Sequence, residues 1–233
     1  MSIYTQGQPT KLGLKIVEFR ARTTIKTIKK FTSGNRMLEI GPGRGIFAKE
    51  AIKQGYEYDA ISPYQEELQI DGAHEVFYGA WPRMMKHSYD VIVAQHVIEH
   101  CAGYEQAFVF AEYAYKYLNK GGLFFVCAPD CRYGIQQFYL CDPTHQFVTN
   151  IHRVCNLLTN AQFEIADARL AMCGLKFPWY LFIHIGVQLP LKFAMKLFPM
   201  GLLYYFTDYK PGQSTKLMKI RNIIPECRIV GIK

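Results

Sequence analysis

The sequence predicts an α/β fold built on a doubly wound, mostly parallel β-sheet. Patterns typical of strands and helices alternate from residue 37 to residue 168, an order that predicts right-handed crossovers. The segment 89–94 is almost continuously apolar, as expected of a strand covered by helices on both faces. The short apolar run 37–40 stops at a turn of alternating glycines, 41–45, before a helical pattern. In such sheets, ligands bind beyond the carboxyl ends of the strands.

The first expected element is a basic amphipathic helix over 11–31, in which apolar residues recur at helical spacing among Lys and Arg. After the strand 37–40, a helix over 46–54 is closed by Gly55. A helix over 104–118 ends at an Asn-Lys-Gly-Gly run. The remaining expected elements are strands at 58–61, 75–78, 89–94, 123–128, 163–168 and 227–233, and a helix at 151–160.

The 233 residues fit a single domain with a substantial core, because half of them are apolar. We expect the core at 37–170 and 225–233, with a helical insertion at 171–224 before the final strand. The uncharged run of this apolar insertion, 177–191, is shorter than the ~20 residues of a membrane-crossing helix. We expect the insertion to form a substrate lid, a surface for a homodimer or a platform on an anionic membrane.

The net charge of +8 is unevenly distributed along the chain. Residues 1–36 sum to +7, residues 37–169 to −6 and residues 170–233 to +7. Two basic flanks around an acidic middle favour an anionic surface or substrate near the flanks, although solvated basic faces explain the same pattern.

Seven cysteines without framework-like spacing, and a start without a signal-peptide pattern, indicate a reducing cytoplasm. Any peripheral membrane contact is then expected at the inner membrane face. A candidate zinc site could be formed by Cys127, Cys131, Cys141 and His145, but the sequence contains no C-x2-C pair. Free thiols in a core explain these cysteines better, and we expect no metal.

Glu39, at the end of the first expected strand, places a carboxylate beside the glycine turn. Glycines leave the backbone accessible there, because no Cβ stands in the way of a flat ligand. The carboxylate suits a cationic or hydroxyl-rich ligand and would repel a pyrophosphate. The pair of features therefore argues against a dinucleotide.

Four sequence blocks at fitting intervals resemble the class I S-adenosylmethionine-dependent methyltransferases, in particular the small-molecule branch called type 11 or type 23. The blocks are the glycine motif 38–45, the strand with its acid-histidine ending 89–100, the turn 118–123, and the Asp-Pro-Thr-His run 142–145 followed by 163–165. The resemblance implies a Rossmann-like, seven-stranded sheet whose last strand is antiparallel. It also implies S-adenosyl-L-methionine as cofactor and S-adenosyl-L-homocysteine as product.

The resemblance places the cofactor against the carboxyl ends of four strands. Ser62 stands where the family normally has the acid that grips both ribose hydroxyls, and Ala80 lies where a second acid is common. Trp81 could stack on the adenine or pack in the core. The implied cofactor-binding residues are Glu39, Gly41, Pro42, Gly43, Gly45, Ser62, Pro63, Gly79, Ala80, Trp81 and Gln95.

Methyl transfer to a hydroxyl also requires a base, and histidine suits that role. His145 is the favoured base, with Asp142 nearby to orient it, because the Asp-Pro-Thr-His loop is expected to overhang the substrate mouth. His96, directly after the fourth strand, is the second candidate, and His100 is more typical of a structural role. Each histidine could instead only hydrogen-bond a loop.

The acceptor expected from the sequence is an oxygen nucleophile on a small molecule, a sugar or a lipid-linked intermediate. The Asn/Asp-Pro-Pro-aromatic sequence typical of nucleobase or amide N-methylation is missing after the fourth strand, where 94–97 reads Ala-Gln-His-Val. No recognition module for RNA accompanies the fold, so nucleic acid is an unlikely partner. The alternative to an active O-methyltransferase is a catalytically weak or inactive methyltransferase-like binding protein.

Overall fold

The computed structural model describes residues 11–63, 70–133, 143–172, 175–176 and 226–233. Asp142, Cys141 and nearly all of the insertion 171–224 lie outside the described residues. The predictions that rest on them therefore stay predictions. No helix in the described ranges combines the length and apolar character needed to cross a bilayer.

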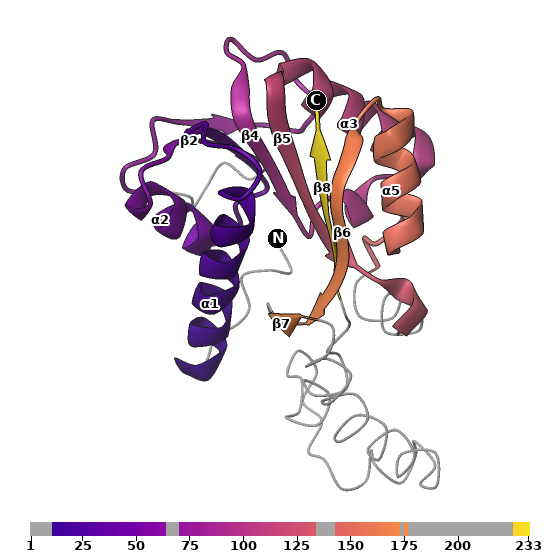
Figure 1. Ribbon diagram of the computed structural model, residues 1–233, viewed down its shortest axis with the longest axis horizontal. Coiled ribbons are helices and arrows are strands. Elements are labelled where there is room, and N and C mark those ends of the chain that lie inside the picture. The colour runs from indigo at the N-terminus through magenta and orange to yellow at the C-terminus, as the bar shows by residue number, and fades with distance from the viewer. Residues whose placement is uncertain (1–10, 64–69, 134–142, 173–174, 177–225) are drawn as a thin grey trace, which may run out of the picture.

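One mixed sheet forms the centre of the molecule (Figure 1), with strand order β3-β2-β1-β4-β5-β8-β6-β7. The strands β1 to β5 are parallel to one another, whereas β8 is antiparallel to both β5 and β6. The predicted Rossmann-like sheet with an antiparallel last strand is confirmed, and the two-residue β7 extends it beyond seven strands. The strands are β1 Arg36–Ile40, β2 Glu57–Ser62, β3 Glu75–Tyr78, β4 Tyr89–Gln95, β5 Leu118–Pro129, β6 Glu164–Met172, β7 Leu175–Lys176 and β8 Glu226–Ile232.

Helices cover both faces of this sheet, as a parallel sheet requires. On one face, α1 and α2 bury Ile25, Ile28 and Phe47 against strand residues such as Val91 and Phe125. On the other face, the core contains side chains of α3 and α5 packed on alternate strand residues. The α-helices are α1 Lys11–Ile28, α2 Ile46–Lys53, α3 Tyr104–Tyr117 and α5 Ile151–Asn160, and the short 3-10 helices are η2 Ile98–His100 and η3 Cys131–Tyr133.

Most boundaries match the prediction, and three differences have clear causes. Helix α1 ends at Ile28 because the residues up to Phe31 continue as tight turns, with Phe31 N donating to Ile28 O. Strand β5 begins at Leu118, which pairs with Tyr89 before the register shifts across the glycine run. Strand β6 continues to Met172 because its pairing with β8 extends as far as the Ala171–Glu226 pair.

Strand register fixes where a site can form. Ile40 of β1 pairs with Ile61 of β2 and with Ala94 of β4, so these three strands end together. Pro129, at the carboxyl end of β5, pairs with Glu226 at the beginning of β8. Because β8 runs in the opposite direction, its first residue reaches the same edge of the sheet as the carboxyl ends of the parallel strands.

Candidate functional site

The glycine turn 41–45 leaves β1 at the carboxyl edge of the sheet. Gly41, Gly43 and Gly45 have φ angles of 72°, 54° and 70°, in the left-handed region that favours glycine. Gly41 N donates to Ile61 O at 2.9 Å, and Gly45 N donates to Pro42 O at 2.9 Å. These bonds hold the turn between β1 and the start of α2.

Two of these glycines face different surroundings. A Cβ on Gly41 would lie 2.7 Å from Cγ2 of Val97, so this glycine allows close packing inside the protein. A Cβ on Gly43 would meet no heavy atom within 4 Å. The backbone at Gly43 therefore offers open space at the place where the glycine motif predicts a close approach to a ligand.

Glu39 lies under this turn, buried at the end of β1. The Tyr58 hydroxyl donates a hydrogen bond to its carboxylate. Burial raises the pKa of Glu39 to about 8, against the opposing effect of hydrogen bonds from Tyr58 and Gln95. A nearby cationic ligand would favour the ionised form, so this carboxyl group is suited to a positively charged partner.

The residues predicted after the second and third strands meet at the same edge. Ser62 is buried at the end of β2, and its carbonyl accepts a hydrogen bond from Gly79 N at 2.9 Å. Pro63 and Ala80 are exposed beside them. The structure thus brings the β2 and β3 ends together, next to the turn after β1.

Trp81 is buried against α3. Its indole N–H donates to Phe110 O at 3.1 Å, and its ring makes edge contacts with Phe110, Tyr113 and Tyr117 at centroid distances of 6.0 to 6.3 Å. Of the two roles considered from the sequence, these contacts favour core packing over stacking on a ligand.

His96 follows β4 in a left-handed conformation, with φ 55°, and its backbone N–H donates to Cys127 O at 2.8 Å. Its Nε2 lies 2.8 Å from the Arg20 guanidinium and 3.4 Å from Glu226 Oε1, while Nδ1 lies 3.4 Å from Glu99 Oε1. Burial alone would lower the pKa of His96. The contacts with Cys127, Glu226 and Glu99 outweigh burial and raise the pKa of His96 well above its usual value.

Glu226 is the central carboxylate of this cluster. It forms ion pairs with Arg20 of α1 and, at 3.2 Å, with Arg228 of β8. Burial opposes ionisation, but Arg20, His96 and Arg228 together lower the pKa of Glu226 well below its usual range. The cluster therefore ties α1, the end of β4 and the start of β8 together with charged groups.

A second cluster joins Glu99, His100 and His145, whose nitrogen and carboxylate oxygen atoms all lie within 4.8 Å of one another. Gln146 N and Phe147 N donate to Glu99 O at 3.0 and 3.1 Å, which fixes the loop beside η2. The Glu99 side chain is buried, and its two carboxylate oxygens have no hydrogen-bond partner among the described residues. This loop attachment places His145 beside a buried carboxylate.

Comparisons with known proteins agree with this arrangement. The model of a family described as a methyltransferase domain matches residues 15–168. The chain belongs to this methyltransferase family. No curated protein matches the chain.

Solved structures show the same fold as this methyltransferase. A SAM-dependent methyltransferase from Archaeoglobus fulgidus is 18% identical, with a TM-score of 0.60 and 94% of each chain covered. The cyclopropane synthase MmaA2 from Mycobacterium tuberculosis is 15% identical, with a TM-score of 0.60, covering 100% of this chain and 88% of its own. The N-methyltransferase NodS from Bradyrhizobium japonicum, in complex with S-adenosyl-L-homocysteine, is 12% identical, with a TM-score of 0.57 and coverage of 94% and 87%. The comparisons support S-adenosylmethionine as the cofactor.

Sequence reasoning missed several residues at this edge of the sheet. It did not find Tyr58, Arg20, Glu226 or Arg228, which contact the predicted residues Glu39 and His96 either directly or through Glu226. One signal was available: Glu226 is a single acid beside the apolar run of the final strand. An acid in a buried strand indicates a charged partner.

Exchanging Glu226 for Gln should lower the free energy of unfolding at pH 7 by about 3 kcal/mol, because two guanidinium groups lose their counter-charge while the side-chain shape is retained. The folded pKa of Glu226 is lowered, so its stabilisation is full above the unfolded value of 4.5 and is lost as pH falls below it. Urea denaturation from pH 3 to pH 7 measures both effects. The control is Glu112→Gln, an exposed site on α3, and an equal loss in both variants would contradict the prediction.

Proposed function

We propose that this methyltransferase transfers a methyl group from S-adenosylmethionine to an oxygen of a small molecule, sugar or lipid-linked acceptor, with His145 as the general base. The observation that carries the proposal is the position of His145 beside the buried carboxylate of Glu99, at the side of the sheet where β4 ends. A base held next to a carboxylate is an arrangement suited to removing a hydroxyl proton.

The residues at the end of β1 fit the cofactor. Gly43 provides open backbone, and Glu39 provides a buried carboxyl group whose ionisation a cation would favour. When bound, S-adenosylmethionine supplies an already activated methyl group, so the protein mainly has to orient the acceptor and exclude water. We propose that the cofactor is held by Glu39, Gly41, Pro42, Gly43, Gly45, Ser62, Pro63, Gly79, Ala80 and Gln95.

Gly43→Ala should leave the protein folded but lower its affinity for S-adenosylmethionine at least tenfold, because the new methyl group enters the space assigned to the cofactor. The matched control is Gly55→Ala, since Gly55 is also left-handed, at φ 89°, and a Cβ there also meets nothing within 4 Å. Both variants should lose about 1 kcal/mol of stability from the strained backbone. Calorimetric titration is the measurement, and unchanged affinity in Gly43→Ala would refute this placement of the cofactor.

Glu39→Gln should bind S-adenosylmethionine at least tenfold more weakly than the wild type. Without ligand, the stability of the variant relative to the wild type should increase as pH rises. The folded pKa of Glu39, about 8, exceeds the unfolded value of 4.5, so the unliganded protein loses stability between these pH values. The variant lacks this loss, which thermal unfolding from pH 5 to pH 8 measures. Titration in buffers of different ionisation enthalpy should show proton release on binding in the wild type only. Identical proton release in both proteins would count against Glu39.

The surroundings of the two candidate bases differ. His96 is held between Arg20 and two carboxylates, and these contacts engage both of its ring nitrogens. His145 is the better candidate on this argument. Asp142, the orienting residue expected from the sequence, lies outside the described residues, and Glu99 is the described carboxylate near His145.

Replacing His145 by Ala should lower kcat by about 10²- to 10⁴-fold while the affinity for S-adenosylmethionine stays unchanged. The control is His152→Ala, an exposed histidine on α5. Product release is measured across a panel of glycans, phenols and isoprenoid-linked lipids. Full turnover in His145→Ala would exclude His145 as the base.

Turnover of the wild type should also persist in EDTA. Loss of turnover in EDTA would favour a cation bound between His100, His145 and Glu99 over a metal-free reaction.

A second candidate function is a cofactor-binding protein with weak or no catalysis. It is favoured by Ser62 and Ala80, which stand where acids are common in the family. Failure to bind S-adenosylmethionine at high micromolar concentration would favour this second function. The role of the insertion 171–224 as lid, homodimer surface or membrane platform remains a prediction.

A further inference from the structure

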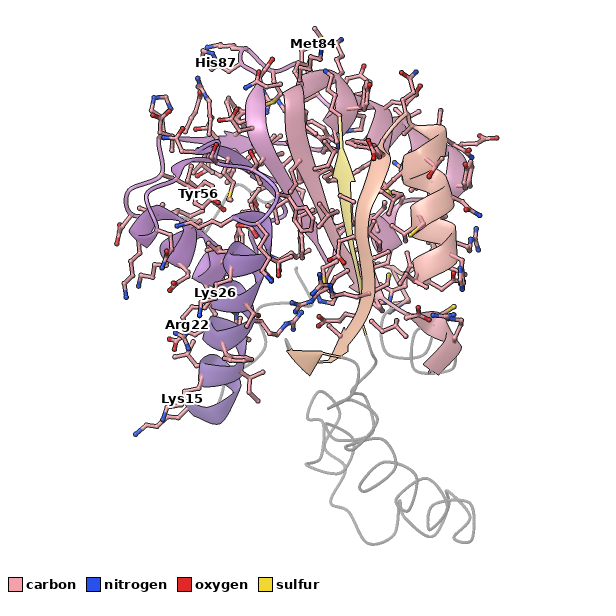
Figure 2. The ribbon with its side chains drawn as sticks, in the orientation of Figure 1. Lys15, Arg22, Lys26, Tyr56, Met84 and His87 are labelled. Carbon is pink, nitrogen blue, oxygen red and sulfur yellow. The ribbon has the colours of Figure 1, made fainter. Side chains whose placement is uncertain are left out.

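The outer face of α1 carries a stripe of basic side chains. Lys15, Arg22 and Lys26 are exposed and project from the side of the helix away from the sheet (Figure 2). Positions 15, 19, 22 and 26 are separated by four, three and four residues, which places them on one helical face. The helix holds five Lys or Arg residues and a single acid. Three cations of the N-terminal flank are therefore displayed on one face of α1.

Exposed apolar side chains interrupt this charge. Phe19, at the centre of the stripe, is 41% exposed, and Ile16 beside it is 36% exposed. Leu14 and Val17 are also exposed, but their spacing places them on the opposite face, in line with the buried residues Ala21, Ile25 and Ile28. A basic helix face that presents an aromatic ring and an aliphatic side chain has the composition of helices that lie on a bilayer surface.

The position of α1 connects this face to the site. The first turns of the helix extend beyond the ends of β4 and β5 (Figure 1). From the side of α1 that faces the sheet, Arg20 contacts His96 and Glu226. The outer stripe and the His96 cluster are thus separated by one helix thickness, about 10 Å.

We propose that the outer face of α1, defined by Lys15, Ile16, Phe19, Arg22 and Lys26, docks onto a bilayer that contains anionic phospholipid. The cations complement the negative surface potential of such a bilayer, and Phe19 and Ile16 enter the headgroup region. A nucleic acid would use the cations alone and gain little from an aliphatic side chain. Docking through α1 brings the site beside the bilayer, which deepens the proposed function by favouring an acceptor with a lipid anchor.

The test is sedimentation of the full chain with vesicles of phosphatidylcholine containing phosphatidylserine. The variant Lys15→Gln/Arg22→Gln/Lys26→Gln should partition about 100-fold less, since each cation near such a surface contributes about 1 kcal/mol and 1.4 kcal/mol is a factor of ten. The matched control is Lys86→Gln/Lys116→Gln/Lys120→Gln, which removes three exposed cations elsewhere and should bind as the wild type does. Salt at 0.5 M should release the wild type.

Phe19→Ser tests the apolar part and should reduce partitioning about tenfold without changing the salt dependence. Equal binding to pure phosphatidylcholine, an equal loss in the control triple variant, or tighter binding to random RNA than to the anionic vesicles would each overturn the proposal. Circular dichroism confirms that the variants fold. Calorimetry with S-adenosylmethionine on the same samples separates failure of membrane docking from failure of the proposed function.

Discussion

The arrangement of the site depends on the ion pairs formed by the buried carboxylate of Glu226. Because β8 is antiparallel to β5, its first residue lies at the edge where the parallel strands end. A parallel strand in that place would begin at the opposite edge of the sheet. The reversed strand thus brings one acid within reach of Arg20 on α1 and His96 after β4. The ionic contact of α1 with this edge of the sheet follows from that reversal, in addition to the apolar packing of Ile25 and Ile28.

Two buried carboxyl groups at this edge behave in opposite ways. Glu226 is surrounded by cations that keep it ionised, whereas Glu39 has the uncharged donors Tyr58 and Gln95 and retains its proton to a higher pH. A charge that is already paired serves structure, and a carboxyl group without a counter-ion is available to a charged ligand. The same chemical group therefore has a structural role at the start of β8 and, in the function proposed above, a binding role at the end of β1.

The sequence was sufficient for the sheet and its helices because their signals are local. The apolar run of β4 and the glycines after β1 are recognisable from residue spacing alone. Helix α5 begins and ends at the residues expected from the sequence, 151 and 160. The cluster around Glu226 could not be found in this way, since Arg20 and Glu226 meet only after the chain has crossed the whole sheet. Trp81 illustrates the same limit, because only the packing against α3 distinguishes a core indole from one that faces a ligand.

The loop beside η2 is attached through main-chain atoms, with both amides directed at the Glu99 carbonyl. At 146 this anchor requires only a main-chain N–H, which proline lacks, whereas the Phe147 side chain is also buried in the core. Related enzymes could therefore vary the exposed position 146, while Phe147 and the two backbone hydrogen bonds keep the neighbouring imidazole in place. Among relatives, we expect position 146 to vary but to exclude proline, and position 147 to remain a large apolar residue.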